Sequence, residues 1–192
     1  MTDLSNTAEE ILRHTRPLIL SGGYDGFSYA DISSIVGIRK ASIHHHFPTK
    51  AQLVRVLVER YRREALDGLG HLDKAIADPA EKLRAYTGYW QSCIASGSEP
   101  FCVCALLASQ MPALPEEVAA EVRAHFRALA AWLTNVFRDG LEQGSLRMVH
   151  EPEIEAEVFV ATVHGAMLSS RAHGNAAVFE MIVGPLVERF IK

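Results

Sequence analysis

The sequence lacks the features that mark membrane, secreted and disulfide-stabilised proteins. None of its apolar runs approaches the roughly 20 residues that a membrane-spanning helix needs, although 48% of its 192 residues are hydrophobic. Its polar and acidic beginning, MTDLSNTAEE, predicts that no secretory signal is present. The cysteines Cys93, Cys102 and Cys104 are an odd number in one short stretch, so we expect free thiols and a cytoplasmic protein.

The sequence also shows no strand-like alternation, no internal repeat and no low-complexity stretch. Apolar residues instead recur at helical spacing, as Leu83, Tyr86, Trp90 and Ile94 do. This spacing predicts an all-α chain with about nine helices, at residues 7–21, 29–36, 39–46, 49–70, 79–97, 100–111, 116–141, 153–173 and 176–190. Pro17 lies inside the first of them and is expected to kink or interrupt it.

Charge is distributed unevenly along the chain. The net charge is −4, but residues 1–63 carry +3 and the remainder carries −7. A basic N-terminal part fits contact with phosphates, and DNA would repel the acidic remainder. The charges therefore favour a nucleic-acid contact in the N-terminal third of the chain, and the alternative is that they form an ordinary solvated face.

Residues 28–47 predict two short helices joined at Gly37. Ser28 is a suitable N-cap for the first helix, and Ile32, Ile35 and Val36 have the spacing of one apolar face. Gly37 permits the sharp turn, after which Ile43 and Phe47 face inward. The outward positions of the second helix are polar or cationic, which indicates a helix-turn-helix with a recognition helix for the major groove: Arg39, Lys40, Ser42, His44 and His45.

The last two predicted helices are rich in small and apolar residues. Small residues such as Gly165 and Ala166 allow close helix packing, and Leu186 and Phe190 belong to a second apolar face. These residues either pack within one chain or build a four-helix homodimer interface. A helix-turn-helix favours the homodimer, because two half-sites need two copies of the motif.

The N-terminal part resembles the TetR/AcrR family of bacterial one-component repressors. The resemblance rests on Ile11-Leu12, Gly23-Tyr24, Ile32, Val36-Gly37-Ile38, Lys40, Ile43, His46-Phe47, Lys50 and Leu53. It implies a DNA-binding domain at residues 1–50 with its motif at 28–47, a connecting helix at 51–71, and an effector-binding and dimerisation domain at 72–192. His44 and His45 depart from the family pattern, which usually has two aromatic residues there, so the operator sequence cannot be inferred from the family.

The resemblance also implies roles in binding double-stranded operator DNA. Ser28, Tyr29 and Lys50 would hold phosphates, whereas Arg39, Lys40, Ser42, His44 and His45 would face the groove. Each of these residues could equally be part of an ordinary solvated surface. The three consecutive histidines do not predict a metal site, because adjacent residues on a helix diverge by about 100°.

The segment from Phe101 to Ala108 resembles, more weakly, the N-ethylmaleimide-responsive repressors of this family. Cys102 is the matching cysteine, and Pro100 would place it near a helix start, where the thiolate is favoured. The alternative is that Cys102 and Cys104 are small buried residues.

A pocket for a small-molecule effector of unknown identity is expected among aromatic, sulfur-containing and histidine residues of the C-terminal part. Such a stripe is also typical of an ordinary core. The candidates are Tyr86, Trp90, Cys93, His125, Phe126, Trp132, His164 and Met167.

These observations predict a dimeric transcriptional repressor that a small molecule or an electrophile releases from its operator. The alternative is a helical enzyme or a small-molecule carrier that uses the C-terminal pocket. No nucleophile–base pair, acidic dyad, phosphate-binding loop or HExxH spacing supports an enzyme, and the sequence predicts no cofactor.

Overall fold

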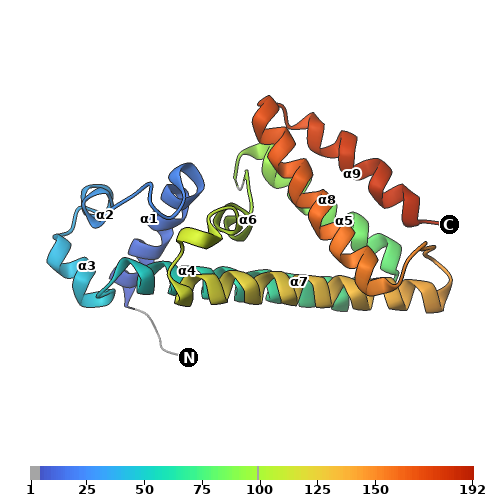
Figure 1. Cartoon of the computed structure of the whole chain (residues 1–192), viewed down its shortest axis with the longest axis horizontal. Helices are drawn as coiled ribbons and strands as arrows, with labels where there is room; N and C mark the ends of the chain where they lie inside the picture. The colour runs from blue at the N-terminus through green and yellow to red at the C-terminus, as the bar shows by residue number, and fades with distance from the viewer. Residues whose placement is uncertain (1–4, 99) are drawn as a thin grey trace. The chain divides into compact units, whose positions relative to one another are not determined.

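The computed structural model of this chain describes residues 5–98 and 100–192, and helices make up almost all of that part (Figure 1). The prediction of an all-α fold with about nine helices is confirmed for the described residues. The elements are α1 (Asn6–Gly22), α2 (Tyr29–Val36), α3 (Lys40–His46), α4 (Lys50–Ala75), α5 (Pro79–Ser96), α6 (Val103–Ala108), the 3-10 helix η1 (Met111–Ala113), α7 (Glu116–Gln143), α8 (Pro152–His173) and α9 (Ala177–Phe190).

Two local predictions need correction. The helix expected at 100–111 is the shorter α6, which ends at Ala108, followed by η1. The residue before a proline disfavours α-helical backbone, so the Met111-Pro112 step belongs to the 3-10 helix η1 and does not extend α6. Helix α1 continues through Pro17 without interruption. None of the helices in the described part of the chain is long and apolar enough to cross a membrane.

The chain forms two units that do not follow a single cut in the sequence. The first unit consists of the described residues up to Arg63 together with Val103–His125. The second consists of Glu64–Cys102 and Phe126–Lys192. Helices α4 and α7 each contribute to both units, whereas α6 and η1 belong with the N-terminal helices.

The first unit has a core of aliphatic and aromatic side chains from α1 to α4. Ile11, Ile19, Ile32 and Ile43 are fully buried there. Helix α2 ends at Gly37, whose φ of 76° lies in the left-handed region that glycine adopts without strain. Ile35 was expected on the inner face of α2, but half of it is exposed, because α2 packs on α1 and α3 through Tyr29 and Ile32.

The second unit is built around an aromatic cluster. The ring of Phe137 lies 4.8 Å from that of Phe190 and 5.8 Å from that of Phe159, measured between centroids. All three side chains are almost completely buried. Helices α8 and α9 lie side by side (Figure 1), and α5 packs against α9.

Candidate functional site

Helix α2 begins with a complete capping box. The hydroxyl of Ser28 accepts a hydrogen bond from the Ala30 N–H at 3.2 Å, and the Asp31 carboxylate accepts from the Ser28 N–H at 2.7 Å and from its hydroxyl at 2.8 Å. These bonds hold the pKa of Asp31 below its usual range. They satisfy orphan amides at the helix start and fix the direction in which α2 enters the motif.

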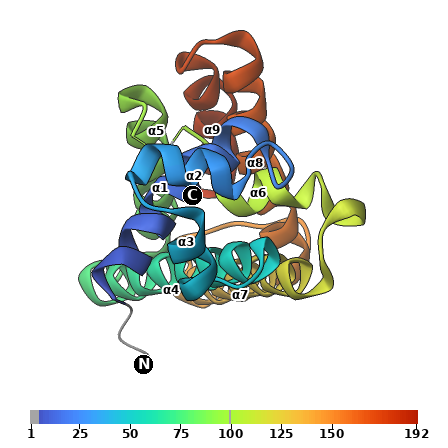
Figure 2. The same cartoon turned by 90° about the vertical axis from the view of Figure 1, so that its left-hand side faces the viewer.

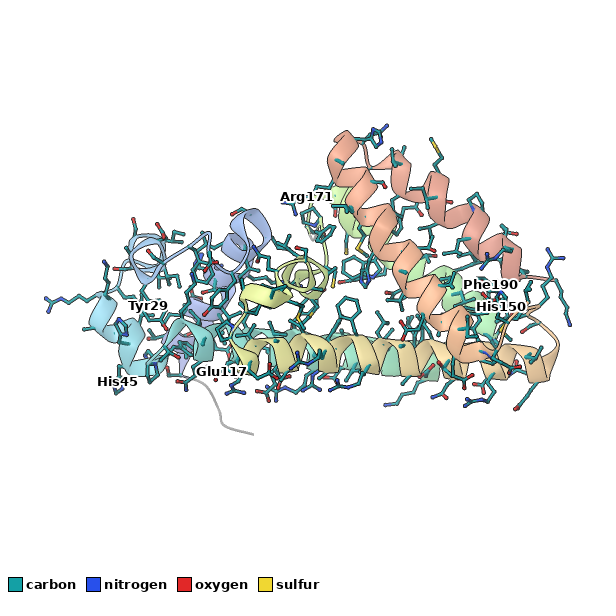
Figure 3. The ribbon with its side chains drawn as sticks, in the orientation of Figure 1. Tyr29, His45, Glu117, His150, Arg171 and Phe190 are labelled. Atoms are coloured by element: carbon teal, nitrogen blue, oxygen red, sulfur yellow. The ribbon has the colours of Figure 1, made fainter. Side chains whose placement is uncertain are left out.

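Helix α3 presents one polar surface and one buried side. Ile43 and Phe47 are buried on the inner side. Of the outward residues, Ser42 is half-buried and the other four are exposed. Figure 2 shows the first unit with α2 and α3 toward the viewer, and Figure 3 shows His45 on the outside of α3. We call the outward set the α3 surface: Arg39, Lys40, Ser42, His44 and His45.

Tyr29, expected at a phosphate, lies in the interior of the first unit. Its hydroxyl donates a 2.7 Å hydrogen bond to the Phe47 carbonyl oxygen, and its side chain points between α2 and α3 (Figure 3). Burial raises its pKa to about 12. Tyr29 therefore joins α2 to the end of α3 in the free protein, and its contact with DNA stays a prediction.

Lys50, also expected at a phosphate, is half-buried and makes contacts within the first unit. Its Nζ donates to the Phe27 carbonyl oxygen at 2.5 Å. The same atom lies 4.3 Å from the Phe27 ring centroid and 4.9 Å from that of Tyr24. Burial lowers the pKa of Lys50, and Asp25 and Asp31 partly oppose that effect. A contact between Lys50 and DNA stays a prediction.

His44 and Gln110 make contacts that sequence reasoning missed. The Nδ1 atom of His44 lies 3.3 Å from the Pro48 carbonyl oxygen, and its ring meets the Tyr29 ring edge-on at 4.7 Å. Gln110, between α6 and η1, accepts a hydrogen bond from the Tyr24 N–H. The sequence carried no signal for Gln110, because the two partners are 86 residues apart.

Eight of the nine candidate effector residues belong to the second unit, and His125 belongs to the first. Tyr86, Trp90, Cys102 and Met167 are buried. The others in the second unit are half-buried: Cys93, Phe126, Trp132 and His164. The structure thus groups most of the predicted set in one unit but separates His125, whose ring lies 5.5 Å from that of Tyr61.

Tyr86 lies at the centre of several predicted residues. Its ring centroid is 5.8 Å from that of Trp132. Burial is the main cause that raises the pKa of Tyr86, the proximity of the Cys102 thiol raises it further, and a hydrogen bond with Trp90 opposes both. The Trp132 indole N–H donates to Asp73 at 3.0 Å, so this group is already satisfied.

His164 differs from the other candidates because its polar atoms are not satisfied. Both ring nitrogens are buried and have no hydrogen-bond partner within the described part of the chain. Its ring meets the Phe126 ring edge-on at 5.2 Å. Buried polar groups are normally hydrogen-bonded, so these nitrogens are available to a polar group that the free chain does not supply.

None of the three cysteines forms a disulfide bond in the described part of the chain. Cys102 and Cys104 are fully buried, whereas Cys93 is half-buried. Cys102 precedes α6, which has only six residues. Over the described residues, no three or more His, Cys, Asp or Glu side chains are grouped so that they could hold a metal ion.

Helices α8 and α9 expose large apolar side chains. The exposed fractions are 51% for Ile154, 37% for Val158, 59% for Leu168 and 69% for Met181. The first three lie on α8 and the last on α9, the two helices on which the sequence predicts a dimer interface.

A capped helix-turn-helix with a polar outer surface places this chain in the class of helix-turn-helix DNA-binding proteins. Residues 11–57 match the family described as "Bacterial regulatory proteins, tetR family". Residues 79–183 match the family described as "Tetracyclin repressor-like, C-terminal domain". The chain therefore belongs to the TetR family of DNA-binding transcriptional regulators, which are not enzymes.

Similar proteins agree with this assignment. The crystal structure of a TetR family transcriptional regulator from Agrobacterium tumefaciens is 58% identical, with a TM-score of 0.95 over 96% of this chain and 97% of that chain. "Transcriptional regulator AcuR" from Cereibacter sphaeroides is 26% identical over 172 residues, which are 88% of this chain and 78% of AcuR.

The reduced form of E. coli NemR has the same fold, with a TM-score of 0.85 and 20% identity over 97% of this chain and 98% of that chain. At this identity the likeness concerns the fold alone.

Proposed function

We propose that this protein is a dimeric repressor that binds operator DNA through α3 and leaves it when a small molecule binds in the second unit. The α3 surface is the observation that carries the proposal. Its exposed cations and hydrogen-bonding side chains lie on a helix whose inner side is fixed by Ile43, Phe47 and the Tyr29 hydroxyl. Such a helix suits insertion into the major groove, where Arg and Lys pair with guanine and Ser and His serve several base edges.

In this proposal residues 1–50 bind DNA, residues 51–71 connect, and residues 72–192 bind the effector and dimerise. Ser28, Tyr29 and Lys50 are assigned to phosphates, and the α3 surface to base edges. The Ser28 hydroxyl is exposed, but it donates its proton to the Asp31 carboxylate, so Ser28 would have to exchange that partner for a phosphate oxygen. Tyr29 and Lys50 would have to exchange a carbonyl partner for a phosphate.

The dimer is proposed to form through α8 and α9. The exposed apolar side chains of these helices support it, because burying them removes apolar surface from water. A two-fold dimer would present two α3 helices to half-sites about 34–36 Å apart. Effector binding that favours another spacing would then lower operator affinity.

The effector is proposed to contact His164 through a polar group and the aromatic residues of the second unit through an apolar part. Two unsatisfied buried nitrogens beside Phe126 support this chemistry. An electrophile that reaches Cys102 would act on the same unit by a covalent route. The burial of Cys102 means that such a reagent must enter through a local opening.

A gel shift with the DNA upstream of the neighbouring gene tests the proposal. We expect saturable, competitor-resistant binding with Kd on the order of 10⁻⁸ M in moderate salt. Lys40→Ala should weaken binding, because it removes one cation from the DNA-contacting surface. The magnitude of the slope of log K against log salt concentration should fall by about one. Lys74→Ala is the matched control, because Lys74 is exposed near the end of α4 in the second unit.

Purely nonspecific binding would contradict the repressor and favour a small-molecule carrier. Transcription in vitro from a promoter that the protein binds separates a repressor from an activator. We expect transcript levels to fall as protein is added.

A further inference from the structure

The exposed His44 side chain carries a ring nitrogen, Nε2, whose chemical role is fixed by the fold. The Pro48 carbonyl oxygen, 3.3 Å from Nδ1, can only accept a hydrogen bond. Nδ1 must therefore carry the proton. A neutral imidazole has one donor and one acceptor nitrogen, so Nε2 of neutral His44 is an acceptor.

Two neighbouring contacts hold the ring in this orientation. The Tyr29 ring meets the His44 ring at an interplanar angle of 61°. In the DNA-free protein Tyr29 is itself held by its hydrogen bond to the Phe47 carbonyl oxygen, which directly precedes the Pro48 carbonyl. When the Tyr29 hydroxyl turns to a phosphate, the contact between Nδ1 and the Pro48 carbonyl still orients the His44 ring. Two successive carbonyls at the corner between α3 and α4 are thus satisfied by Tyr29 and His44, whose rings touch.

The Nε2 atom has no hydrogen-bond partner within residues 5–98 and 100–192, and the His44 side chain is exposed on the α3 surface. His45, the next residue on this surface, makes a ring contact with His46, and no backbone acceptor fixes its tautomer within the described residues. His44 is therefore the histidine of the α3 surface whose tautomer is set by a backbone acceptor.

We propose that His44 is a specificity-determining residue that selects an amino base, adenine or cytosine, on the DNA strand it contacts. In the major groove adenine presents its N6 amino group and cytosine its N4 amino group, and both donate hydrogen bonds. Guanine presents the acceptors N7 and O6, and thymine presents O4 and a methyl group. An acceptor at Nε2 matches the first pair of bases and opposes the second.

This inference rests on the proposed insertion of α3 into the major groove and adds the class of base that one side chain reads.

Selection from a randomised DNA pool at pH 8 tests the inference with the full-length protein, at a pH where histidine is predominantly neutral. For the wild type we expect one motif position at which adenine or cytosine is enriched at least fivefold over guanine and thymine. His44→Arg should change that position to guanine, because the guanidinium donates to O6 and N7. His44→Leu should remove the preference there and leave the other positions unchanged.

His45→Arg is the matched control, since it places the same new donor one residue away on the same surface. It should not convert the position that responds to His44→Arg. The inference is overturned if the motif position that changes in the His44 variants prefers guanine or thymine in the wild type. It is also overturned if no position of the motif changes in any His44 variant. A wild-type pool without any enriched sequence contradicts the proposed function as well.

Nitrogen NMR of the DNA-free protein provides a readout that does not depend on the operator. The ¹⁵N shifts of His44 at pH 8 should report a proton on Nδ1 and a bare Nε2. A proton on Nε2 overturns the inference even where a DNA motif is found.

Discussion

The side-chain oxygen of Gln110 accepts a 2.8 Å hydrogen bond from the backbone N–H of Tyr24. This bond joins the segment between α6 and η1 to the turn between α1 and α2, both within the first unit. Gly23, next to Tyr24, has a φ of 71°, and a Cβ added there would collide with the Gln110 amide. The turn and Gln110 therefore fit together only because residue 23 has no side chain.

Gly23→Ala should consequently destabilise the protein. Gly23 has φ 71° and ψ −162°, a backbone region used almost only by glycine, and alanine there is strained by about 1–3 kcal/mol. Displacing Gln110 also loses a hydrogen bond with a net contribution of about 1 kcal/mol. We expect urea denaturation to show a fall of roughly 2 kcal/mol in the free energy of unfolding. Gly88→Ala is the control, since Gly88 lies in α5 with open space around it. Helix propensity predicts a gain of about 0.5–1 kcal/mol there, and equal losses in both variants would contradict the explanation.

Tyr29→Phe should change stability in a pH-dependent way. The substitution leaves the Phe47 carbonyl without its 2.7 Å donor, which costs about 1–2 kcal/mol near pH 8. The pKa of Tyr29 is raised from 10.0 to about 12 in the folded protein. This pKa difference stabilises the folded protein relative to the unfolded chain. The stabilisation is complete below pH 10 and is lost as the pH rises from 10 to about 12.

The gap in unfolding free energy between wild type and Tyr29→Phe should therefore narrow above pH 10, because only the wild type loses this contribution. Denaturant titrations at several pH values between 8 and 11.5 measure the gap. Tyr89→Phe, at a position that is 52% exposed, is the control and should show no such narrowing. If the difference in unfolding free energy between wild type and Tyr29→Phe stays constant above pH 10, then folding does not raise the pKa of Tyr29.

Features of this protein that depend on residues close together in the sequence were predictable, whereas contacts between distant residues were not. The helices were predictable because residues such as Leu83, Tyr86 and Trp90 recur at helical spacing, and all three are buried as expected. The capping box at Ser28 is likewise local, and the sequence identified its first residue.

The partners of buried polar groups were not predictable in this way. Tyr29 opens an apparently exposed helix start, but its hydroxyl bonds to a carbonyl 18 residues later. Gln110 reaches Tyr24 across 86 residues. Helical spacing also cannot separate a pocket from a core, because both need apolar side chains on one face. His164 became distinctive only when the structure left its nitrogens unpaired.

His164→Leu should stabilise the protein that contains no effector. Removing two buried, unsatisfied nitrogens relieves a desolvation cost, and a gain of about 1 kcal/mol in the free energy of unfolding is expected. His125→Leu is the matched control, because His125 is buried against Tyr61 and has interactions of its own. That variant should lose about 1–3 kcal/mol. A loss at both positions would show that His164 is an ordinary core histidine.

Leu168→Glu should produce a monomer. Leu168 is 59% exposed on α8, so the charge is tolerated in a single chain but not in an apolar interface. Light scattering coupled to size-exclusion chromatography should give the dimer mass for the wild type and the monomer mass for the variant. Val149→Glu, at an 85% exposed position between α7 and α8, should remain dimeric. A Leu168→Glu dimer would place the interface elsewhere.

The three cysteines should react with N-ethylmaleimide at different rates. Cys93 is half-buried and should be labelled first. Cys102 and Cys104 are fully buried and should be labelled more slowly. Local opening of the second unit is needed to expose Cys102, and local opening of α6 is needed to expose Cys104. Mass spectrometry of peptides from timed reactions measures the order of labelling.

If an electrophile acts through Cys102, release of DNA should follow the labelling of Cys102 and not that of Cys93. Cys102→Ser should then abolish release by the reagent, and Cys93→Ser should leave release unchanged. Release that persists in Cys102→Ser would exclude Cys102 as the trigger and leave reversible binding near His164 as the effector mechanism to be tested.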